Sequence, residues 1–140
     1  MKPAHFVIVD DDVINNRLCQ LCIARHFGPV KIESFQNPLI ALEVIGSKNH
    51  DSIGSKVLFL DIHMPQLSGW DFLQRFAMFD NNVKSQFKIY ILSASSDAEQ
   101  IDRAWKHPLV AGFISKPLGE KKLERIFREL PEEFGMKCFY

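Results

Sequence analysis

Short apolar segments alternate with helical patterns along the 140-residue chain. Four of these segments are runs of hydrophobic residues without polar alternation, at residues 6–9, 57–60, 89–92 and 112–114. Such runs are typical of parallel strands that are buried on both faces of a sheet. A fifth segment, residues 30–35, alternates polar and apolar residues and predicts a half-exposed edge strand.

Helical periodicity fills the intervals between the predicted strands, with apolar residues at steps of three and four. Each of the first four patterns follows residues that commonly begin helices. These start signals are Asp10-Asp11-Asp12, Asn37-Pro38, Ser68-Gly69, and Ser96 or Asp97. The apolar positions of the five patterns are Ile14, Leu18, Leu21 and Cys22; Leu42 and Ile45; Trp70, Leu73, Phe76 and Ala77; Ile101, Ala104 and Trp105; Leu123, Ile126, Phe127 and Leu130. We expect Trp105 and the last of these stripes to face the core.

Strand and helix therefore alternate five times, which predicts an α/β fold with a five-stranded parallel sheet flanked by five helices. No repeat, low-complexity tract or linker divides the chain. We expect one domain over residues 1–130 and a short C-terminal tail over residues 131–140.

Acidic, hydroxyl and ammonium side chains follow the ends of the buried runs. The residues at these ends are Asp10, Asp11, Asp12, Asp61, Ser93 and Lys116. Because reactive residues of parallel sheets gather where the strands end, we expect these side chains to meet at one edge. Carboxylates held close together resist joint ionisation unless a cation neutralises them, and hard divalent ions with oxygen ligands suit this task. The pattern predicts a site for Mg²⁺, with Mn²⁺ as a second candidate ion, and phosphoryl chemistry on an aspartate.

The composition of the chain excludes some classes of function. The 17 Lys and Arg residues balance the 17 Asp and Glu residues, so the chain lacks the basic surplus of proteins that bind nucleic acid by bulk electrostatics. Its apolar runs are far shorter than the roughly 20 residues needed to span a bilayer. The odd set of cysteines, Cys19, Cys22 and Cys138, is typical of a reducing compartment, so we expect a cytoplasmic location.

Four motifs in the same order resemble those of the receiver domain in two-component response regulators. They are VIVDD at residues 7–11, LFLDIHMP at 58–65 with Ser68-Gly69 beyond it, ILSA at 91–94 and ISKP at 114–117. Each motif follows or ends a predicted strand, and the resemblance covers residues 5 to about 130. It implies the flavodoxin-like (βα)5 receiver fold.

The resemblance also implies roles for the residues at the strand ends. Asp61 would accept a phosphoryl group, and Lys116 would pair with the phosphoryl oxygens. Asp11 would bind Mg²⁺ directly and Asp10 largely through water, while Asp61 and the backbone carbonyl of His63 would complete the protein ligands.

Further positions match the parts of the family that respond to phosphorylation. Ser93 would move toward the phosphoryl group, and Phe113 would pack into the space it leaves. This switch would remodel the surface formed by the fourth helix, fifth strand and fifth helix. His63 and Ser95 would tune the lifetime of the phosphoryl group, and the Lys116–Pro117 peptide bond would be cis.

The implied function is that of a stand-alone phosphoacceptor in a phosphorelay. The phosphoryl group would come from a sensor histidine kinase or a histidine phosphotransfer protein. The chain would catalyse only its own phosphorylation and dephosphorylation, act without nucleic acid or membrane, and be a monomer or a phosphorylation-dependent dimer. Its downstream protein target is not defined by the sequence.

Two alternatives remain open at this point. The segment from Asp10 to Val13 approximates the D-x-D-x-T/V nucleophile motif of haloacid-dehalogenase-like phosphatases. Those enzymes also need an acidic pair on a strand after the lysine, and Asp61 would have no role in them. The other alternative is a receiver-fold scaffold that is never phosphorylated.

Overall fold

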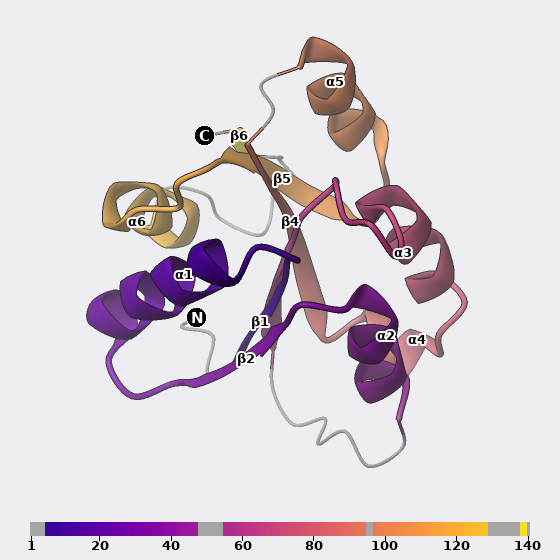
Figure 1. The fold of residues 1–140 in the computed structure, drawn as a ribbon, viewed down its shortest axis with the longest axis horizontal. Coiled ribbons are helices and arrows are strands. Elements are labelled where there is room, and N and C mark those ends of the chain that lie inside the picture. Colours follow the sequence, from indigo (N-terminus) through magenta and orange to yellow (C-terminus); the bar gives the residue numbers. More distant parts are fainter. Residues whose placement is uncertain (1–4, 48–54, 95–96, 129–137, 140) are drawn as a thin grey trace.

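A single parallel sheet forms the centre of the molecule (Figure 1). The computed structural model describes residues 5–47, 55–94, 97–128 and 138–139. The strands are β1 (His5–Val9), β2 (Lys31–Phe35), β3 (Lys56–Leu60), β4 (Phe87–Ser93), β5 (Val110–Ser115) and β6 (Cys138–Phe139). They lie in the order β2-β1-β3-β4-β5-β6, and every pair of neighbours is parallel.

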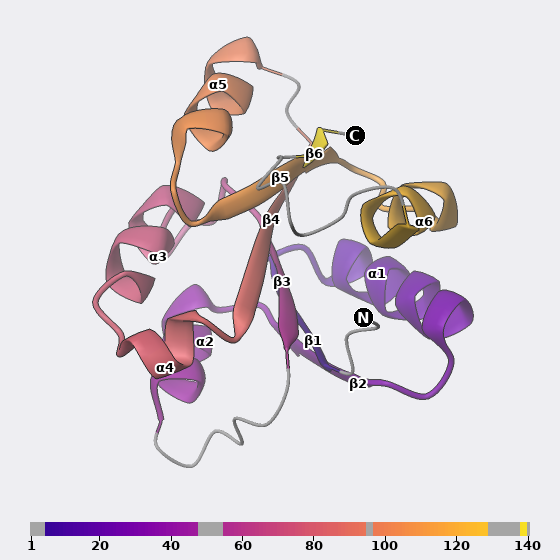
Figure 2. The same cartoon turned by 180° about the vertical axis from the view of Figure 1, so that it is seen from behind.

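Helices cover both faces of the sheet, as Figures 1 and 2 show from opposite sides. The helices are α1 (Val13–Phe27), α2 (Pro38–Gly46), α3 (Gly69–Phe76), α4 (Asn81–Lys84), α5 (Ala98–Lys106) and α6 (Glu120–Arg128). α1 and α6 lie side by side on one face, while α2, α3 and α5 lie on the other. The predicted five parallel strands with flanking helices are confirmed.

Alternate residues of each buried strand place their side chains in two separate cores, as expected where successive side chains point to opposite faces of the sheet. In β1, Val7 and Val9 join the core beneath α2, α3 and α5. Phe6 and Ile8 join the core beneath α1 and α6. Both cores are continuous across β1, β3, β4 and β5, so the hydrophobic effect fixes the register of these strands and the edge at which they end.

One predicted core residue, Trp105, was wrong, and the apolar stripe of α1 does not face the core either. The apolar stripe Ile14, Leu18 and Leu21 of α1 faces solvent, because the buried face of this helix begins with Asn15 and Asn16 and continues with Cys19 and Ile23. Trp105 is 56% exposed, because α5 buries only Ala104.

Two short elements were not predicted. α4 lies between α3 and β4, and β6 pairs with β5 through Gly112–Cys138 and Phe113–Phe139. Ser95 and Leu130 lie outside the described residues. None of the helices in the described part of the chain combines the length and apolar character needed to cross a bilayer.

Candidate functional site

The backbone ladder of the sheet continues into the residues that end its strands. The amide of Asp10 donates to the carbonyl of Phe35 at 3.0 Å, and that of Asp61 donates to Val9 at 2.9 Å. The amide of Lys116 donates to the carbonyl of Ser93 at 2.9 Å. These bonds fix the main chain of three candidate residues at one sheet edge.

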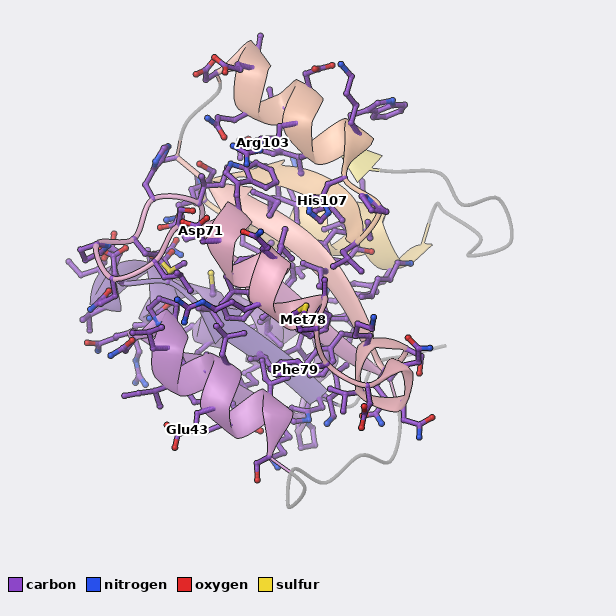
Figure 3. The ribbon with its side chains drawn as sticks, turned by 90° about the vertical axis from the view of Figure 1, so that its right-hand side faces the viewer. Glu43, Asp71, Met78, Phe79, Arg103 and His107 are labelled. Atoms are coloured by element: carbon purple, nitrogen blue, oxygen red, sulfur yellow. The ribbon has the colours of Figure 1, made fainter. Side chains whose placement is uncertain are left out.

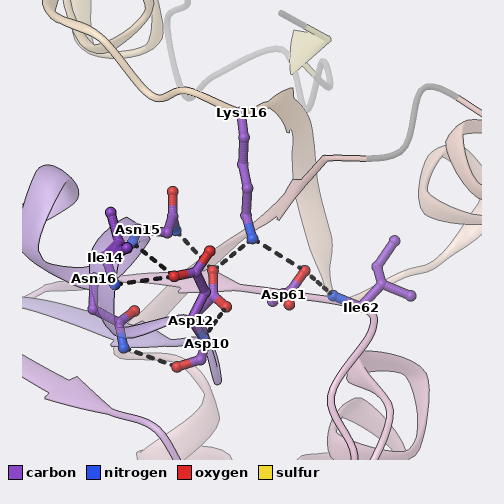
Figure 4. A network of polar contacts seen from close by, with 8 residues as sticks. All are labelled: Asp10, Asp12, Ile14, Asn15, Asn16, Asp61, Ile62 and Lys116. Carbon is purple, nitrogen blue, oxygen red and sulfur yellow. Dashed lines mark hydrogen bonds and ion pairs between the residues drawn. The ribbon is translucent and has the colours of Figure 1, made fainter.

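Asp10 is held from several sides at the start of α1 (Figure 4). It is 1% exposed, and its carboxylate accepts hydrogen bonds from the Asp12 amide at 2.9 Å and the Asn15 side chain at 2.7 Å. The Asn16 side chain donates to the Asp10 carbonyl at 2.8 Å. Asp12 caps α1 by accepting from the amides of Ile14 and Asn15. The first turn of α1 therefore holds the Asp10 carboxylate in place.

Lys116 extends from the end of β5 to a position between two carboxylates (Figure 4). Its Nζ lies 2.7 Å from Asp10 Oδ2 and 3.6 Å from Asp61 Oδ1. Burial alone would lower the pKa of Lys116, but the contacts with Asp10 and Asp61 outweigh burial and raise it. The ammonium group therefore stays charged and offsets part of the negative charge of the site.

Asp61 ends β3 and is 6% exposed. Its Oδ1 accepts a hydrogen bond from the Ile62 amide at 2.9 Å. Burial, followed by the negative charge of Asp10, raises the pKa of Asp61 to about 7, while Lys116 opposes this rise. The site is thus short of positive charge when both carboxylates are ionised.

The carboxylates of Asp10, Asp11 and Asp61 each offer a ligand oxygen, and these oxygens lie within 4.8 Å of one another. Asp11 is exposed, whereas the other two are buried. An all-oxygen set of this kind fits a hard divalent cation such as Mg²⁺ and does not favour softer metals.

Comparison with known proteins identifies the family of the chain. The sequence profile of the response regulator receiver domain matches residues 6–128. The chain belongs to this family.

Solved receiver structures share the fold at low sequence identity. A response regulator receiver protein from Dyadobacter fermentans superposes with a TM-score of 0.80 at 22% identity, covering 89% of this chain and 95% of its own. A two-component response regulator from Cytophaga hutchinsonii gives a TM-score of 0.77 at 24% identity, covering 92% of this chain and 97% of its own. These likenesses concern the fold alone.

Curated relatives match a smaller part of the receiver domain. Protein-glutamate methylesterase/protein-glutamine glutaminase 2 of Bordetella avium is 33% identical over 75 residues, which is 54% of this chain and 20% of the relative. Stress response regulator protein 1 of Candida albicans is 30% identical over 79 residues, or 54% of this chain and 26% of the relative. The chain thus spans about a fifth to a quarter of the length of these relatives.

Four further candidate residues of the receiver domain are Ser93, Phe113, His63 and Ser95. Ser93 is buried at the end of β4, and Phe113 is buried in the core beneath α2, α3 and α5. His63 is exposed two residues beyond Asp61, and Ser95 lies outside the described residues. The Lys116–Pro117 peptide bond is cis, as expected for a receiver domain.

Sequence reasoning missed the residues that support the site. Asn15 and Asn16 hold Asp10, and their only signal in the sequence is a pair of asparagines in the first turn of the predicted helix. Gly69 is part of the motif quoted from the sequence, and the structure gives the reason for it, because a Cβ at this position would lie 2.5 Å from the carbonyl oxygen of Asp61. Only glycine allows the start of α3 to approach the backbone of Asp61 this closely.

Proposed function

We propose that this chain is a phosphoacceptor switch in which Asp61 takes a phosphoryl group from a phosphohistidine. The donor is a sensor histidine kinase or a histidine phosphotransfer protein. The observation that supports this role most directly is the buried carboxylate of Asp61 at the end of β3, with Lys116 Nζ 3.6 Å from Oδ1. In the phosphatase alternative this pairing would have no purpose.

In the proposed reaction, a carboxylate oxygen of Asp61 forms a bond to phosphorus while the phosphorus–nitrogen bond of the phosphohistidine breaks. The electron pair of the broken bond stays on the imidazole nitrogen of the donor, which takes up a proton. Lys116 lies beside the attacking carboxylate and offsets the charge on the phosphoryl oxygens. Asp10, held by Asn15 and Asn16, keeps Lys116 in position.

The residues present fit a bound Mg²⁺, with Mn²⁺ as a second candidate ion. Asp10, Asp11, Asp61 and the backbone carbonyl of His63 would hold it. When bound, the ion supplies positive charge that neutralises the carboxylates and the phosphoryl oxygens. Asp61 would then be ionised at neutral pH despite its raised pKa, as a nucleophile must be.

The proposed response to phosphorylation begins at Ser93 and Phe113. Ser93 would move toward the phosphoryl group, and Phe113 would repack in the space this opens. Phe113 belongs to β5, and its side chain is in the core beneath α5. Its movement would therefore remodel the surface of α5, β5 and α6, where α5 and α6 are the fourth and fifth of the predicted helices. We assign the tuning of phosphoryl lifetime to His63 and Ser95.

The exposed apolar stripe of α1 supports a protein donor. Ile14 is 72% exposed, Leu18 54% and Leu21 48%. The stripe starts four residues after Asp10, so a partner that covers it would hold its phosphohistidine close to Asp61. Clustered apolar side chains on a surface commonly mark protein interfaces. We propose that the phosphohistidine protein docks here.

We propose a receiver domain over residues 1–130 and a short tail over residues 131–140. The protein would act in the cytoplasm and would catalyse only its own phosphorylation and dephosphorylation. Cys19 and Cys22 are free thiols, which supports a reducing compartment.

Intact mass measurement after incubation with acetyl phosphate and Mg²⁺ tests the proposal. We expect the wild type to gain one phosphoryl group and Asp61→Asn to gain none, because the amide is a poor nucleophile. Chelation of the metal should abolish the gain in the wild type.

Asp71→Asn is the matched control, since Asp71 is an exposed aspartate on α3 away from the carboxylate cluster. It should be phosphorylated like the wild type. Equal phosphorylation of Asp61→Asn and the wild type would show that Asp61 is not the acceptor.

A further inference from the structure

α5 is weakly anchored to the rest of the domain. Ala104 is the one buried residue among the nine of this helix. A groove of about 530 Å³ lies between α3 and the segment from Arg103 to Leu109. Its apolar lining comes from Trp70, Leu73, Ala77, Pro108 and Leu109, and Arg103 and His107 lie along the α5 side. Few buried apolar contacts mean that little free energy is needed to displace this helix.

Trp70 bridges the groove. This buried side chain lies at the start of α3, and its Nε1–H donates a hydrogen bond to Gln100 Oε1 of α5 at 2.7 Å. The guanidinium of Arg103 lies 4.7 Å from the centre of the Trp70 ring, and the His107 ring stacks on it at 6.0 Å. Figure 3 shows Arg103 on the side of α5 that faces α3, and His107 beyond the end of this helix. One α3 side chain therefore makes three contacts with α5 and the residue after it.

The same segment of α3 touches the phosphoacceptor. Gly69, which precedes Trp70, donates its amide hydrogen to the carbonyl of Ile62 at 2.8 Å. Its Cα lies against the backbone carbonyl of Asp61, since an added Cβ would come within 2.5 Å of that oxygen. A change in the backbone at Asp61 therefore reaches Trp70 through a single residue.

We propose that Trp70 is a positioning residue that ties the position of α5 to the state of Asp61. The inference rests on the proposed function, because it requires Asp61 to be the phosphoacceptor. α5 begins five residues after Ser93, so movement of Ser93 toward a phosphoryl group pulls on the start of α5. The contacts of Trp70 with Gln100, Arg103 and His107 hold α5 in the position of the unmodified protein and oppose that movement.

The sign of the effect follows from linkage. Contacts made only in the unmodified state favour that state, so removing one of them shifts the equilibrium toward the switched state. A ligand that mimics the phosphoryl group then binds more tightly. Loss of one net hydrogen bond corresponds to a change of about two- to ten-fold in affinity.

Trp70 and Trp105 are the only two tryptophans of the chain, so Trp105→Phe leaves Trp70 as a single fluorescent reporter. Fluoroberyllate with Mg²⁺ is the probe, and its binding is measured independently by fluorine NMR of the bound fluoride. We expect fluoroberyllate to change the emission of Trp70 in Trp105→Phe, and Asp61→Asn in the same background to abolish the change. Adding Gln100→Leu should lower the half-saturating fluoroberyllate concentration about two- to ten-fold.

Gln74→Leu is the matched control, because it makes the same substitution on the α3 side of the same groove. It should bind fluoroberyllate like its parent. Gln100→Glu keeps an acceptor oxygen for Trp70 Nε1–H and should also bind fluoroberyllate with the affinity of the parent. A general loss of stability on substitution of Gln100 would not spare this variant.

The outcomes separate the two proposals. Bound fluoride with no change in Trp70 emission, or with equal affinity in Gln100→Leu and Gln74→Leu, overturns the role of Trp70 and leaves the phosphoacceptor intact. Absence of bound fluoride in the wild type overturns the proposed function, and the inference with it.

Discussion

The helices α1 and α5 follow β1 and β4, which end at the same edge of the sheet, but they differ in how firmly they are anchored. α1 buries Asn15, Asn16, Cys19 and Ile23, and its cap accepts two amide hydrogens. α5 buries Ala104 alone, and its cap Asp97 accepts one. The more firmly anchored helix is the one that contacts the acidic residues.

This difference in anchoring suits α1 and α5 to different roles. Ionised carboxylates repel one another, so the α1 side needs fixed donors such as Asn15 and Asn16 to keep Asp10 in place. A helix that reports a chemical change must instead move at little cost, and elements of low local stability supply such motion. The α5 side has that property, with Trp70 as its main polar connection to α3.

The largest expected effect comes from a matched pair of substitutions on the two helices. Ile23→Ala removes a fully buried side chain of α1 and should lower the free energy of unfolding by about 2–5 kcal/mol. Ile101→Ala removes a partly buried side chain of α5 and should cost about 1 kcal/mol. Urea unfolding measures both. Equal losses would show that α5 is anchored as firmly as α1.

A smaller effect on the free energy of unfolding comes from the charge of Asp61 rather than from packing. In metal-free protein the pKa of Asp61 is about 7, above its ordinary value of 3.8, so the folded state favours the protonated carboxyl. The wild type should therefore gain stability as the pH falls through about 7, and this gain should be complete near the ordinary value. Asp61→Asn lacks the charge and should be more stable than the wild type at about pH 8.

Thermal unfolding with a chelator at about pH 8 and about pH 5 measures this difference. The advantage of Asp61→Asn should shrink at the lower pH, while the exposed-site control Asp71→Asn should follow the wild type at both. An advantage that does not depend on pH would point to packing rather than to the charge of Asp61.

The strand ends could be predicted from the sequence because two features agree on them. A buried apolar run stops at Asp10, Asp61 and Ser93, or just before Lys116, and parallel strands end at one edge. The structure brings Asp10, Asp61 and Lys116 into contact, as these positions predicted.

The orientation of the helices could not be predicted in the same way. Periodicity in α1 marks Ile14, Leu18 and Leu21, yet two asparagines occupy the inward positions because Asp10 needs their hydrogen bonds. The contact between Trp70 and Gln100 joins residues 30 positions apart in the chain. Neither residue carries a local signal for it, since the contact depends on how α3 and α5 pack.

The smallest expected effect tests whether the stripe on α1 serves folding at all. Leu18→Gln should change the free energy of unfolding by no more than about 0.5 kcal/mol, because half of this side chain is already in water. Leu123→Gln is the control on α6, where the leucine is fully buried and the polar substitute should cost several times more. A comparable loss at both positions would mean that the stripe stabilises the domain itself. A negligible loss at Leu18 leaves an exposed apolar stripe beside the site that folding does not need, which is the property expected of a surface reserved for a phosphohistidine partner.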